Sequence, residues 1–242
     1  MKRRFDGRMH IKGITSYAEY AHYLDKSPIE FKELVDALTI NVSEFFRDPT
    51  VWRAFQTRIM PAIIREKIQT PQRELRIWSA GCADGEEPYT IAISVIDALL
   101  YNLKASKIEI VATDIDVQSL DRARRGVYSP VRLKLASHSV LHRFFTPVDG
   151  GNLKLSDDVR RLVTFQRHDL FTSPPRSGFD VITCRNVMIY FSRELQQDLF
   201  RNFYQALSSG GYLIVGKVES PPGEYGPLFK CVDLADRVYQ KV

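Results

Sequence analysis

Two glycines and three acidic residues stand together in the stretch WSAGCADGEEPYTIA, residues 78–92. The stretch follows a short apolar run and leads into apolar residues at helical spacing, which is typical of a ligand-binding turn between a strand and a helix. The acids are Asp84, Glu86 and Glu87. The backbone N–H groups at such a helix start suit a pyrophosphate, but a carboxylate ~4 Å from a phosphate costs about 4 kcal/mol at an effective dielectric constant of ~20. The turn therefore favours a phosphate-free nucleotide with positive charge, and S-adenosylmethionine has that chemistry.

The same acids also have a structural explanation. Carboxylates in the first turn of a helix interact favourably with its dipole, so this turn alone supports a structural role for Glu86 and Glu87 as well as ligand binding. The glycine spacing differs from the G-x-G-x-x-G of dinucleotide sites. Of the three carboxylates, we assign Glu86 to the ligand, Glu87 to the helix and Asp84 to the turn.

Two further acidic positions follow strand-like segments downstream. KIEIVATDID, residues 107–116, ends in Asp114 and Asp116, and a carboxylate at the end of the second strand can bind ribose hydroxyls. One of this pair can instead cap the next helix, and we assign Asp114 to the ligand and Asp116 to the cap. After another strand, Asp169 can accept a hydrogen bond from an adenine amino group, and Leu170 can pack on the ring. Acids at the ends of three strands in order favour a nucleotide site.

Strands alternating with helices must position these residues. From residue 71 to residue 242 the alternation predicts a parallel sheet covered on both faces. The expected strands are 75–80, 107–116, 179–187, 212–219 and 236–242, and the expected helices are 88–103, 117–126 and 192–211. Residues 128–163 interrupt this alternation of strands and helices. The turn at Asp149, Gly150 and Gly151 predicts a hairpin within a small β-rich insertion.

Residues 1–70 have only helical patterns. We expect helices over 16–24, 27–40 and 49–68, with a break in the last at Pro61. The sequence therefore predicts a small helical domain and linker over 1–70, followed by an α/β domain over 71–242.

Composition excludes several protein classes. The 242 residues are 44% hydrophobic and 26% charged, which is typical of a folded soluble chain. No apolar run reaches the ~18 residues of a membrane span, and we expect no signal peptide and no direct membrane insertion. Three cysteines without paired spacing indicate neither a disulfide framework nor a metal site, which favours the cytoplasm. The net charge of +5 is a mild bias toward acidic partners.

Five motifs in order resemble the CheR family of chemotaxis-receptor methyltransferases. They are NVSEFFRDP (41–49), WSAGCADGEEPYTIA (78–92), ATDID with GVY (112–128), HDLF (168–171) and CRNVMIYF (184–191). The resemblance covers the chain from about Lys2 to the C-terminus. It implies an S-adenosylmethionine-dependent methyltransferase with a Rossmann-like α/β fold, an inserted small β-subdomain and a preceding all-α domain. The implied reaction is methyl transfer to glutamate side chains of chemoreceptors, with S-adenosylhomocysteine as the product.

The resemblance also assigns roles by motif position. It implies roles in catalysis for Arg47 and Tyr190. It implies cofactor contacts for Asn41, Ser43, Arg47, Ala80, Glu86, Asp114, Asp169, Leu170, Cys184 and Arg185. Ser43 stands where the family usually has Thr, but the hydroxyl is kept. The helical domain looks shorter at its start than the family pattern. Lys217 lies in GKVES, where GHSES is common, and has no assigned role.

This chemistry agrees with the residues themselves. A glutamate carboxylate, with a pKa near 4.3, is already the nucleophile at pH 7, so no general base is required. Arg47 offers a planar charged fork that can clamp a carboxylate, although a surface ion pair with Asp48 or Glu44 would also explain it. Tyr190 can hydrogen-bond the same carboxylate, although core packing would also explain it.

The expected partner is the acidic cytoplasmic helical bundle of a chemoreceptor. A basic cluster at the N-terminus suits such a partner, but charge clusters are also common on solvated faces. Some family members bind a receptor C-terminal pentapeptide on the β-subdomain by strand addition, and no residue here decides whether this chain does. We expect a monomer.

Two other classes compete with this interpretation. A nucleic-acid methyltransferase fits the positive charge, but neither an N/D-P-P-Y/F motif after the fourth strand nor a Pro-Cys pair is present. A non-catalytic sensor of the cofactor is also compatible, but it does not account for Arg47 and Tyr190.

Overall fold

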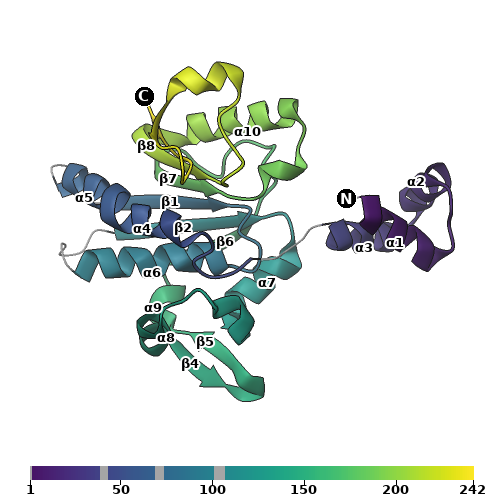
Figure 1. Ribbon diagram of the computed structural model, residues 1–242, viewed down its shortest axis with the longest axis horizontal. Coiled ribbons are helices and arrows are strands. Elements are labelled where there is room, and N and C mark those ends of the chain that lie inside the picture. Colours follow the sequence, from purple (N-terminus) through teal and green to yellow (C-terminus); the bar gives the residue numbers. More distant parts are fainter. Residues whose placement is uncertain (1, 39–42, 69–73, 101–106) are drawn as a thin grey trace. The chain divides into compact units, whose positions relative to one another are not determined.

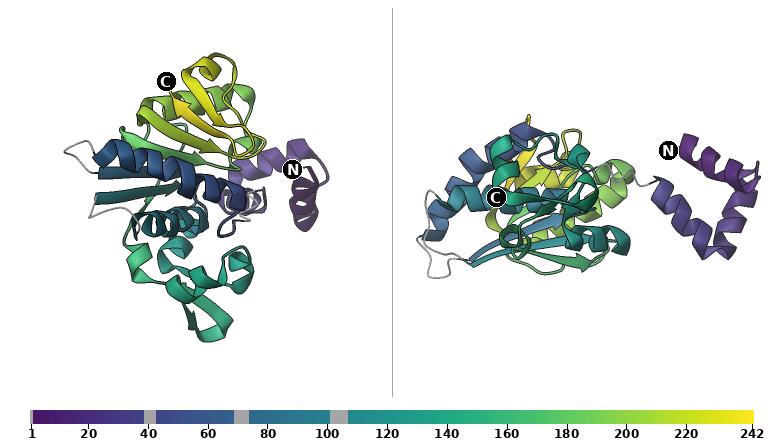
Figure 2. Two further views of the ribbon diagram at one scale, coloured as in Figure 1. Left: turned by 60° about the vertical axis from the view of Figure 1, so that its left-hand side comes forward. Right: turned by 90° about the horizontal axis from the view of Figure 1, so that it is seen from below.

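The structure is a computed structural model that describes residues 2–38, 43–68, 74–100 and 107–242. The chain divides into two compact units, Met1–Val42 and Ser43–Val242. Their elements are drawn in Figures 1 and 2.

The first unit is a small helical domain. Its helices are α1 Lys2–Lys12, α2 Tyr17–Lys26 and α3 Pro28–Leu38. Its buried apolar core consists of Met9, Tyr20 and Leu34. The sequence pattern did not predict α1, because most of this segment is polar and its Ile11 stays 67% exposed. Packing of Met9 against the other two helices overrides that weak pattern.

A buried carboxylate ties the three helices of this unit together. Glu30 in α3 is 1% exposed. It pairs with Arg8 at 2.7 Å and Lys12 at 3.1 Å, and it accepts a hydrogen bond from the Tyr20 hydroxyl at 2.8 Å. The bonds from Arg8 are the main reason why the pKa of Glu30 falls to about 2. Two cations and a hydroxyl thus offset the cost of burying this charge.

The second unit is built on a central sheet. Within the described residues it has seven strands in the order β6-β2-β1-β7-β8-β10-β9. The strands are β1 Glu74–Ala80, β2 Lys107–Asp114, β6 Val163–Arg167, β7 Phe179–Cys184, β8 Leu207–Val215, β9 Phe229–Asp233 and β10 Val238–Lys241. The first five in sheet order run parallel, and β10 is antiparallel to both β8 and β9. This mostly parallel sheet confirms the predicted α/β fold.

Helices cover both faces of the sheet, as Figures 1 and 2 show. They are α4 Pro49–Ala54, the π-helical η1 Phe55–Ile59, α5 Met60–Ile68, α6 Glu86–Leu100, α7 Val117–Arg125 and α10 Arg193–Ala206. Consecutive residues of β1 point to opposite faces of the sheet and pack in different buried clusters. Ile77 packs in one cluster with Phe55 and Ile91, whereas Trp78 packs in the other with Phe203 of α10. Burial on both faces explains why the central strands are almost wholly apolar.

The boundary between the two units differs from the predicted one near residue 70. The helical segment 49–68 belongs to the second unit, because Val51, Trp52 and Phe55 lie in the same buried cluster as Ile77 of the sheet. The helical pattern of this segment was correct. Helical periodicity does not reveal which core a helix joins.

The break expected at Pro61 is also different in the structure. The helix widens by a π turn over Phe55–Ile59, where the Met60 N–H bonds to the Phe55 carbonyl five residues back. Because Pro61 has no N–H, it needs no acceptor in the preceding turn. The chain therefore continues as α5 without ending.

The insertion after α7 is a separate small subdomain, and it confirms the predicted one. Strands β3 Val127–Tyr128, β4 Phe145–Val148 and β5 Asn152–Leu155 form an antiparallel sheet in the order β3-β5-β4. The hairpin turn falls at the predicted glycines, where Gly150 has a φ of 75°. Short helices complete the subdomain. They are η2 Pro130–Leu133, α8 His138–Phe144, η3 Asp149–Gly151 and α9 Asp157–Arg160.

The last third of the chain corrects two further expectations. The helix predicted to continue to residue 211 ends at Ala206, and β8 begins at Leu207. Leu207 pairs with Phe179 and is 3% exposed, so strand pairing overrides its helical spacing. Strand β9 was not predicted. Its one buried residue is Phe229, and so it lacks a clear alternating pattern.

Candidate active site

Four neighbouring parallel strands bring the predicted cofactor residues to one edge of the sheet. Ala80 ends β1, Asp114 ends β2 and Cys184 ends β7. Asp114 pairs in register with Arg167, the last residue of β6, so that Asp169 follows at the same edge. In open parallel sheets, ligands bind beyond this edge.

The turn after β1 is folded tightly against β2. The N–H groups of Gly81 and Cys82 both donate to the Thr113 carbonyl, at 2.8 and 2.9 Å. Gly81 has a φ of 75°, and a Cβ there would lie 2.6 Å from Cγ2 of Val187. Positive φ and this close approach require glycine. The glycines therefore shape the turn, and the first of them makes room for the turn after β7.

Asp114 holds this turn from the neighbouring strand. Its carboxylate accepts the Ala83 N–H at 2.8 Å and the Asp116 N–H at 2.9 Å. Burial raises the pKa of Asp114, and these two N–H groups oppose the rise. Each oxygen can accept a second hydrogen bond, and the side chain is half-buried. Asp116 caps α7 by accepting the Gln118 N–H, as predicted.

The three carboxylates of the turn point to different partners. Glu87 turns inward and accepts hydrogen bonds from Ser79 at 2.9 Å and Thr183 at 2.5 Å, so it ties α6 to β1 and β7. Asp84 pairs with Arg122 at 2.8 Å and with Arg132 at 3.5 Å. Neither is a free charge facing a ligand. The repulsion of phosphate inferred from three carboxylates therefore depends on Glu86 alone.

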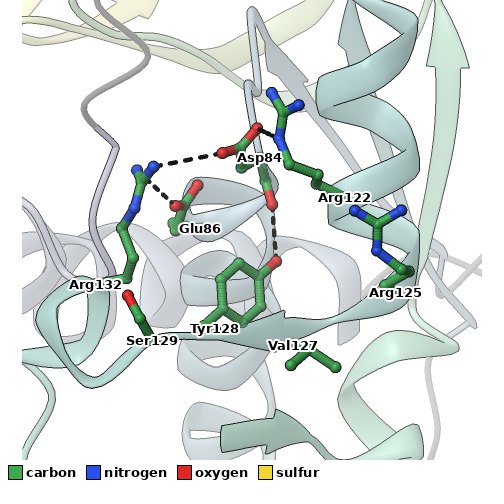
Figure 3. Close-up of a pocket in the computed structure, with 8 residues that line it drawn as sticks. All are labelled: Asp84, Glu86, Arg122, Arg125, Val127, Tyr128, Ser129 and Arg132. Carbon is green, nitrogen blue, oxygen red and sulfur yellow. Dashed lines mark hydrogen bonds and ion pairs between the residues drawn. The ribbon is translucent and has the colours of Figure 1, made fainter. Parts of the chain in front are cut away.

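Glu86 is the carboxylate at the start of α6 and is 0% exposed. Arg132 Nη1 lies 3.0 Å from its Oε1, and a hydrogen bond from the Ser43 side chain also acts to lower its pKa. Burial raises the pKa of Glu86 to about 7, although Arg132 acts to lower it. Figure 3 shows Arg132 beside Glu86 and Asp84 with a dashed line to each, at a pocket of about 190 Å³. A buried carboxylate in this state fits a cationic ligand group.

The segment before α4 lies against the same turn. The Phe46 N–H donates to Thr90 Oγ1 in α6 at 3.1 Å. Phe45 is 0% exposed and packs edge-on against Tyr128 and Phe145 of the insertion, with centroids 4.8 and 5.3 Å apart. Ser43 is bonded through its carbonyl, which accepts from Arg132 at 2.5 Å. Asn41, a predicted cofactor contact, lies outside the described residues.

Arg185 joins this segment to the turn after β7. Its side chain is 2% exposed, pairs with Asp48 at 2.5 Å and lies 5.3 Å from the ring of Trp52. It also donates to the Arg47 carbonyl at 3.1 Å, and Trp52 Nε1 donates to the same carbonyl at 2.8 Å. Arg185 remains a predicted cofactor contact; within the chain it also pairs with Glu87 at 3.4 Å, and its bond to the Arg47 carbonyl fixes the backbone there.

The two carboxylates considered as partners of Arg47 each form an ion pair with another side chain, and Arg47 has an interaction of its own within the chain. Asp48 pairs with Arg185 and, at 3.7 Å, with Lys217, which gives Lys217 a contact that the sequence had not suggested. Glu44 pairs with Lys134 at 3.0 Å.

The turn after β7 depends on a residue that sequence reasoning missed. Glu219 is 6% exposed and accepts N–H groups from Gly216 at 2.5 Å, Met188 at 2.9 Å and Asn186 at 3.2 Å. Asn186 has a φ of 60°, a conformation that non-glycine residues seldom adopt. A carboxylate three residues after a glycine that directly follows a strand is the signal that could have identified it. Glu219 therefore holds the backbone that leads to Tyr190.

The remaining predicted residues differ in accessibility. Tyr190, in the short η4 helix Met188–Tyr190, is 39% exposed, so a ligand can reach it. Asp169 is exposed, and its carboxylate accepts the Phe171 N–H at 3.0 Å. Leu170 packs at the edge of the core under α10. Cys184 is 0% exposed, and its side chain contributes packing.

Comparison with known families agrees with this geometry. Residues 41–237 match the family described as CheR methyltransferase, SAM binding domain, and residues 1–39 match the CheR methyltransferase all-alpha domain. The chain belongs to the CheR methyltransferase family. The resemblance predicted from the motifs is thus confirmed, and with it an enzyme whose cofactor is S-adenosylmethionine.

Relatives from several bacteria are similar over most of their length. A chemotaxis protein methyltransferase of Borreliella burgdorferi is 31% identical over 227 residues, covering 92% of this chain and 80% of that protein. One from Listeria monocytogenes is 32% identical over 228 residues, covering 93% and 84%. Chemotaxis protein methyltransferase 2 of Pseudomonas aeruginosa is 35% identical over 222 residues, covering 90% and 76%.

Among solved structures, a TehB-like SAM-dependent methyltransferase from Corynebacterium glutamicum has a TM-score of 0.38 at 14% identity, covering 83% of this chain and 73% of that one. That likeness is too low to add to the assignment. In the part of the chain that the structure describes, no helix is both long and apolar enough to cross a membrane.

Proposed function

We propose that this enzyme transfers the methyl group of S-adenosylmethionine to glutamate side chains of a chemoreceptor cytoplasmic domain, in the cytoplasm and as a monomer. Family membership and relatives named chemotaxis protein methyltransferase support the reaction. The observation that carries the cofactor site is Glu86, a fully buried carboxylate at the start of α6 with one guanidinium beside it. A cationic, phosphate-free cofactor suits that position better than a phosphate does.

The proposed cofactor contacts follow from the donor set at the strand ends. Glu86 would accept the α-ammonium group, and the free acceptor positions of Asp114 would take the ribose hydroxyls. Asp169 and Leu170 would bind the adenine, Ser43 and Arg47 would approach from the segment before α4, and Ala80 would contribute its backbone. The bound cofactor supplies a methyl group on a positively charged sulfur, which is the electrophile.

The protein's part in the chemistry is to position the acceptor. A glutamate carboxylate is ionised at pH 7, so it needs orientation and exclusion of water but no base. We propose that the Arg47 guanidinium and the exposed Tyr190 hydroxyl hold the acceptor carboxylate in line with the transferring methyl group. Orientation of this kind supplies ~7–11 kcal/mol in favourable cases.

Receptor docking is proposed on two surfaces. The basic residues of the N-terminal unit suit the acidic helical bundle that carries target glutamates. The subdomain sheet has β4 at one edge, where a receptor C-terminal peptide could add as a strand.

The test is incubation with methyl-labelled S-adenosylmethionine and a receptor cytoplasmic domain. We expect the label in the receptor as methyl esters that are released by mild base. A receptor fragment with its acceptor glutamates replaced by alanine is the matched control and should remain unlabelled. If label entered only added RNA or DNA, the proposal would be wrong and the nucleic-acid alternative would stand.

A further inference from the structure

Arg132 connects three parts of the second unit that are far apart in sequence. It lies in η2 of the inserted subdomain. Its guanidinium contacts Glu86 at 3.0 Å, Asp84 at 3.5 Å and the Ser43 carbonyl at 2.5 Å. Its own carbonyl accepts the Phe45 N–H at 2.9 Å. A single residue of the insertion therefore meets both the glycine turn and the segment that leads to Arg47.

The charge of Arg132 matters because of where Glu86 lies. Isolated burial of a carboxylate strongly favours its neutral form, and a nearby cation restores the ionised form. Arg132 is the cation paired with Glu86 in the described residues. A neutral Glu86 would lose most of its attraction for a cationic ligand group.

We propose that Arg132 is a positioning residue of the cofactor site, which keeps Glu86 as a carboxylate and holds the segment from Ser43 to Arg47 against the glycine turn. The inserted subdomain then contributes to cofactor binding as well as to any role in receptor docking. This inference rests on the proposed role of Glu86, and Figure 3 shows the contacts of Arg132 with Glu86 and Asp84.

The groups around Glu86 set the expected pH dependence. Arg132 lowers its pKa and Asp84 raises it. Tyr128 and Cys82 also face it, and burial keeps the pKa of each well above its ordinary value, so both stay neutral near pH 7. With the pKa of Glu86 at about 7, the wild type should bind a cationic ligand more tightly as the pH rises from 6 to 8. Without Arg132 the pKa of Glu86 rises further, so the same increase should occur at higher pH.

The experiment is calorimetric titration of the full chain with S-adenosylhomocysteine, which keeps the α-amino group of the cofactor, from pH 6 to pH 9, with each variant compared with the wild type at the same pH so that titration of the ligand cancels. Relative to the wild type, we expect Arg132→Met to bind about tenfold more weakly at pH 7 and to recover part of that loss at pH 9. Arg132→Lys keeps the charge and should keep the wild-type pH dependence. Arg65→Met is the matched control, because Arg65 is an exposed arginine of α5 that does not line this pocket. It should bind like the wild type.

A double variant separates charge from packing. In a Glu86→Gln background, adding Arg132→Met should no longer shift the pH dependence. A loss of affinity in Arg132→Met that is equal at every pH, or no loss at all, would overturn the inference. If Arg132→Met does not fold, a wild-type pH dependence in Arg132→Lys supports the inference and a shifted one overturns it. Absence of binding by the wild type would instead overturn the cofactor assignment itself.

Discussion

The turns after β1 and β7 use the same device at the same edge of the sheet, but with different exposure. In each, a carboxylate at or shortly after the end of the next parallel strand accepts N–H groups from the turn. Asp114 accepts one N–H from the first turn, that of Ala83, and one from Asp116 after its own strand, and it is half-buried. Glu219 accepts two from the second turn, those of Asn186 and Met188, and one from Gly216 after β8, and it is 6% exposed. Under the proposed function, Asp114 uses its remaining acceptor positions for a ligand, whereas Glu219 binds backbone N–H groups.

Substitutions at the two turns should therefore affect different properties of the enzyme. Substitutions on the β1 and β2 side should weaken cofactor binding. Substitutions on the β7 side should lower stability or turnover, because that side fixes the backbone at Arg47 and leads to Tyr190.

The largest effect is expected from Glu219→Ala. It leaves the buried N–H groups of Gly216, Asn186 and Met188 without their acceptor, and each unsatisfied group costs ~1–3 kcal/mol. The free energy of unfolding, measured with urea, should fall by at least about 3 kcal/mol. Glu224→Ala, at an exposed glutamate nearby, should change it by less than ~0.5 kcal/mol. Equal stability of the two variants would show that Glu219 does not hold the turn.

Arg47→Ala should give the largest effect on turnover. Loss of a group that orients the acceptor costs about a hundredfold in kcat, while the affinity for S-adenosylhomocysteine should change far less. Labelled methyl transfer and calorimetry on one preparation give both values, and Arg53→Ala, at an exposed arginine of α4, is the control. Unchanged turnover in Arg47→Ala would exclude the clamp.

Asp114→Asn should weaken cofactor affinity, and it should cost less stability than Glu219→Ala, because the amide oxygen can still accept one of the two N–H groups that the carboxylate accepts. A hydrogen bond to a charged group contributes ~1.5–3 kcal/mol, which corresponds to a loss of about 10- to 100-fold in affinity. Asp121→Asn, on the exposed face of α7, should bind S-adenosylhomocysteine like the wild type. If calorimetry gave the same affinity for both variants, the contrast between Asp114 and Glu219 would disappear.

The smallest effect is expected from Asp116→Ala. Its carboxylate caps α7 by accepting the Gln118 N–H at 2.9 Å, and loss of such a cap costs ~1 kcal/mol. Thermal or urea unfolding should detect that loss, with cofactor affinity close to that of the wild type. A large loss of affinity would instead mean that both acids of ATDID bind the ligand.

Local signals explain which parts of the fold were predictable. The central strands, α6, α7 and the hairpin at Gly150 were predicted because apolar spacing and turn residues specify them directly. The boundary at residue 42, the helix α1 and the strand β9 were not, because each depends on packing against distant segments. Leu207 illustrates this competition, since strand pairing overrides its helical spacing.

The site residues likewise were predictable where a local motif specifies them and were not where contacts with distant segments do. Asp114 could be identified because its motif places an acid directly at a strand end. Arg132 and Glu219 could not, because their importance comes from bonds to Glu86 and to the turn after β7, across dozens of residues. The sequence also did not reveal that Asp84 and Glu87 are occupied by protein partners, so the charge facing a ligand was overestimated.

A crystal structure of the enzyme with S-adenosylhomocysteine tests the central claim most directly. We predict the ribose hydroxyls within hydrogen-bond distance of Asp114, the α-ammonium group beside Glu86, and Glu219 still bonded to the backbone of the turn after β7. A ligand bound away from Asp114 and Glu86, or in contact with the Glu219 carboxylate, would contradict the account.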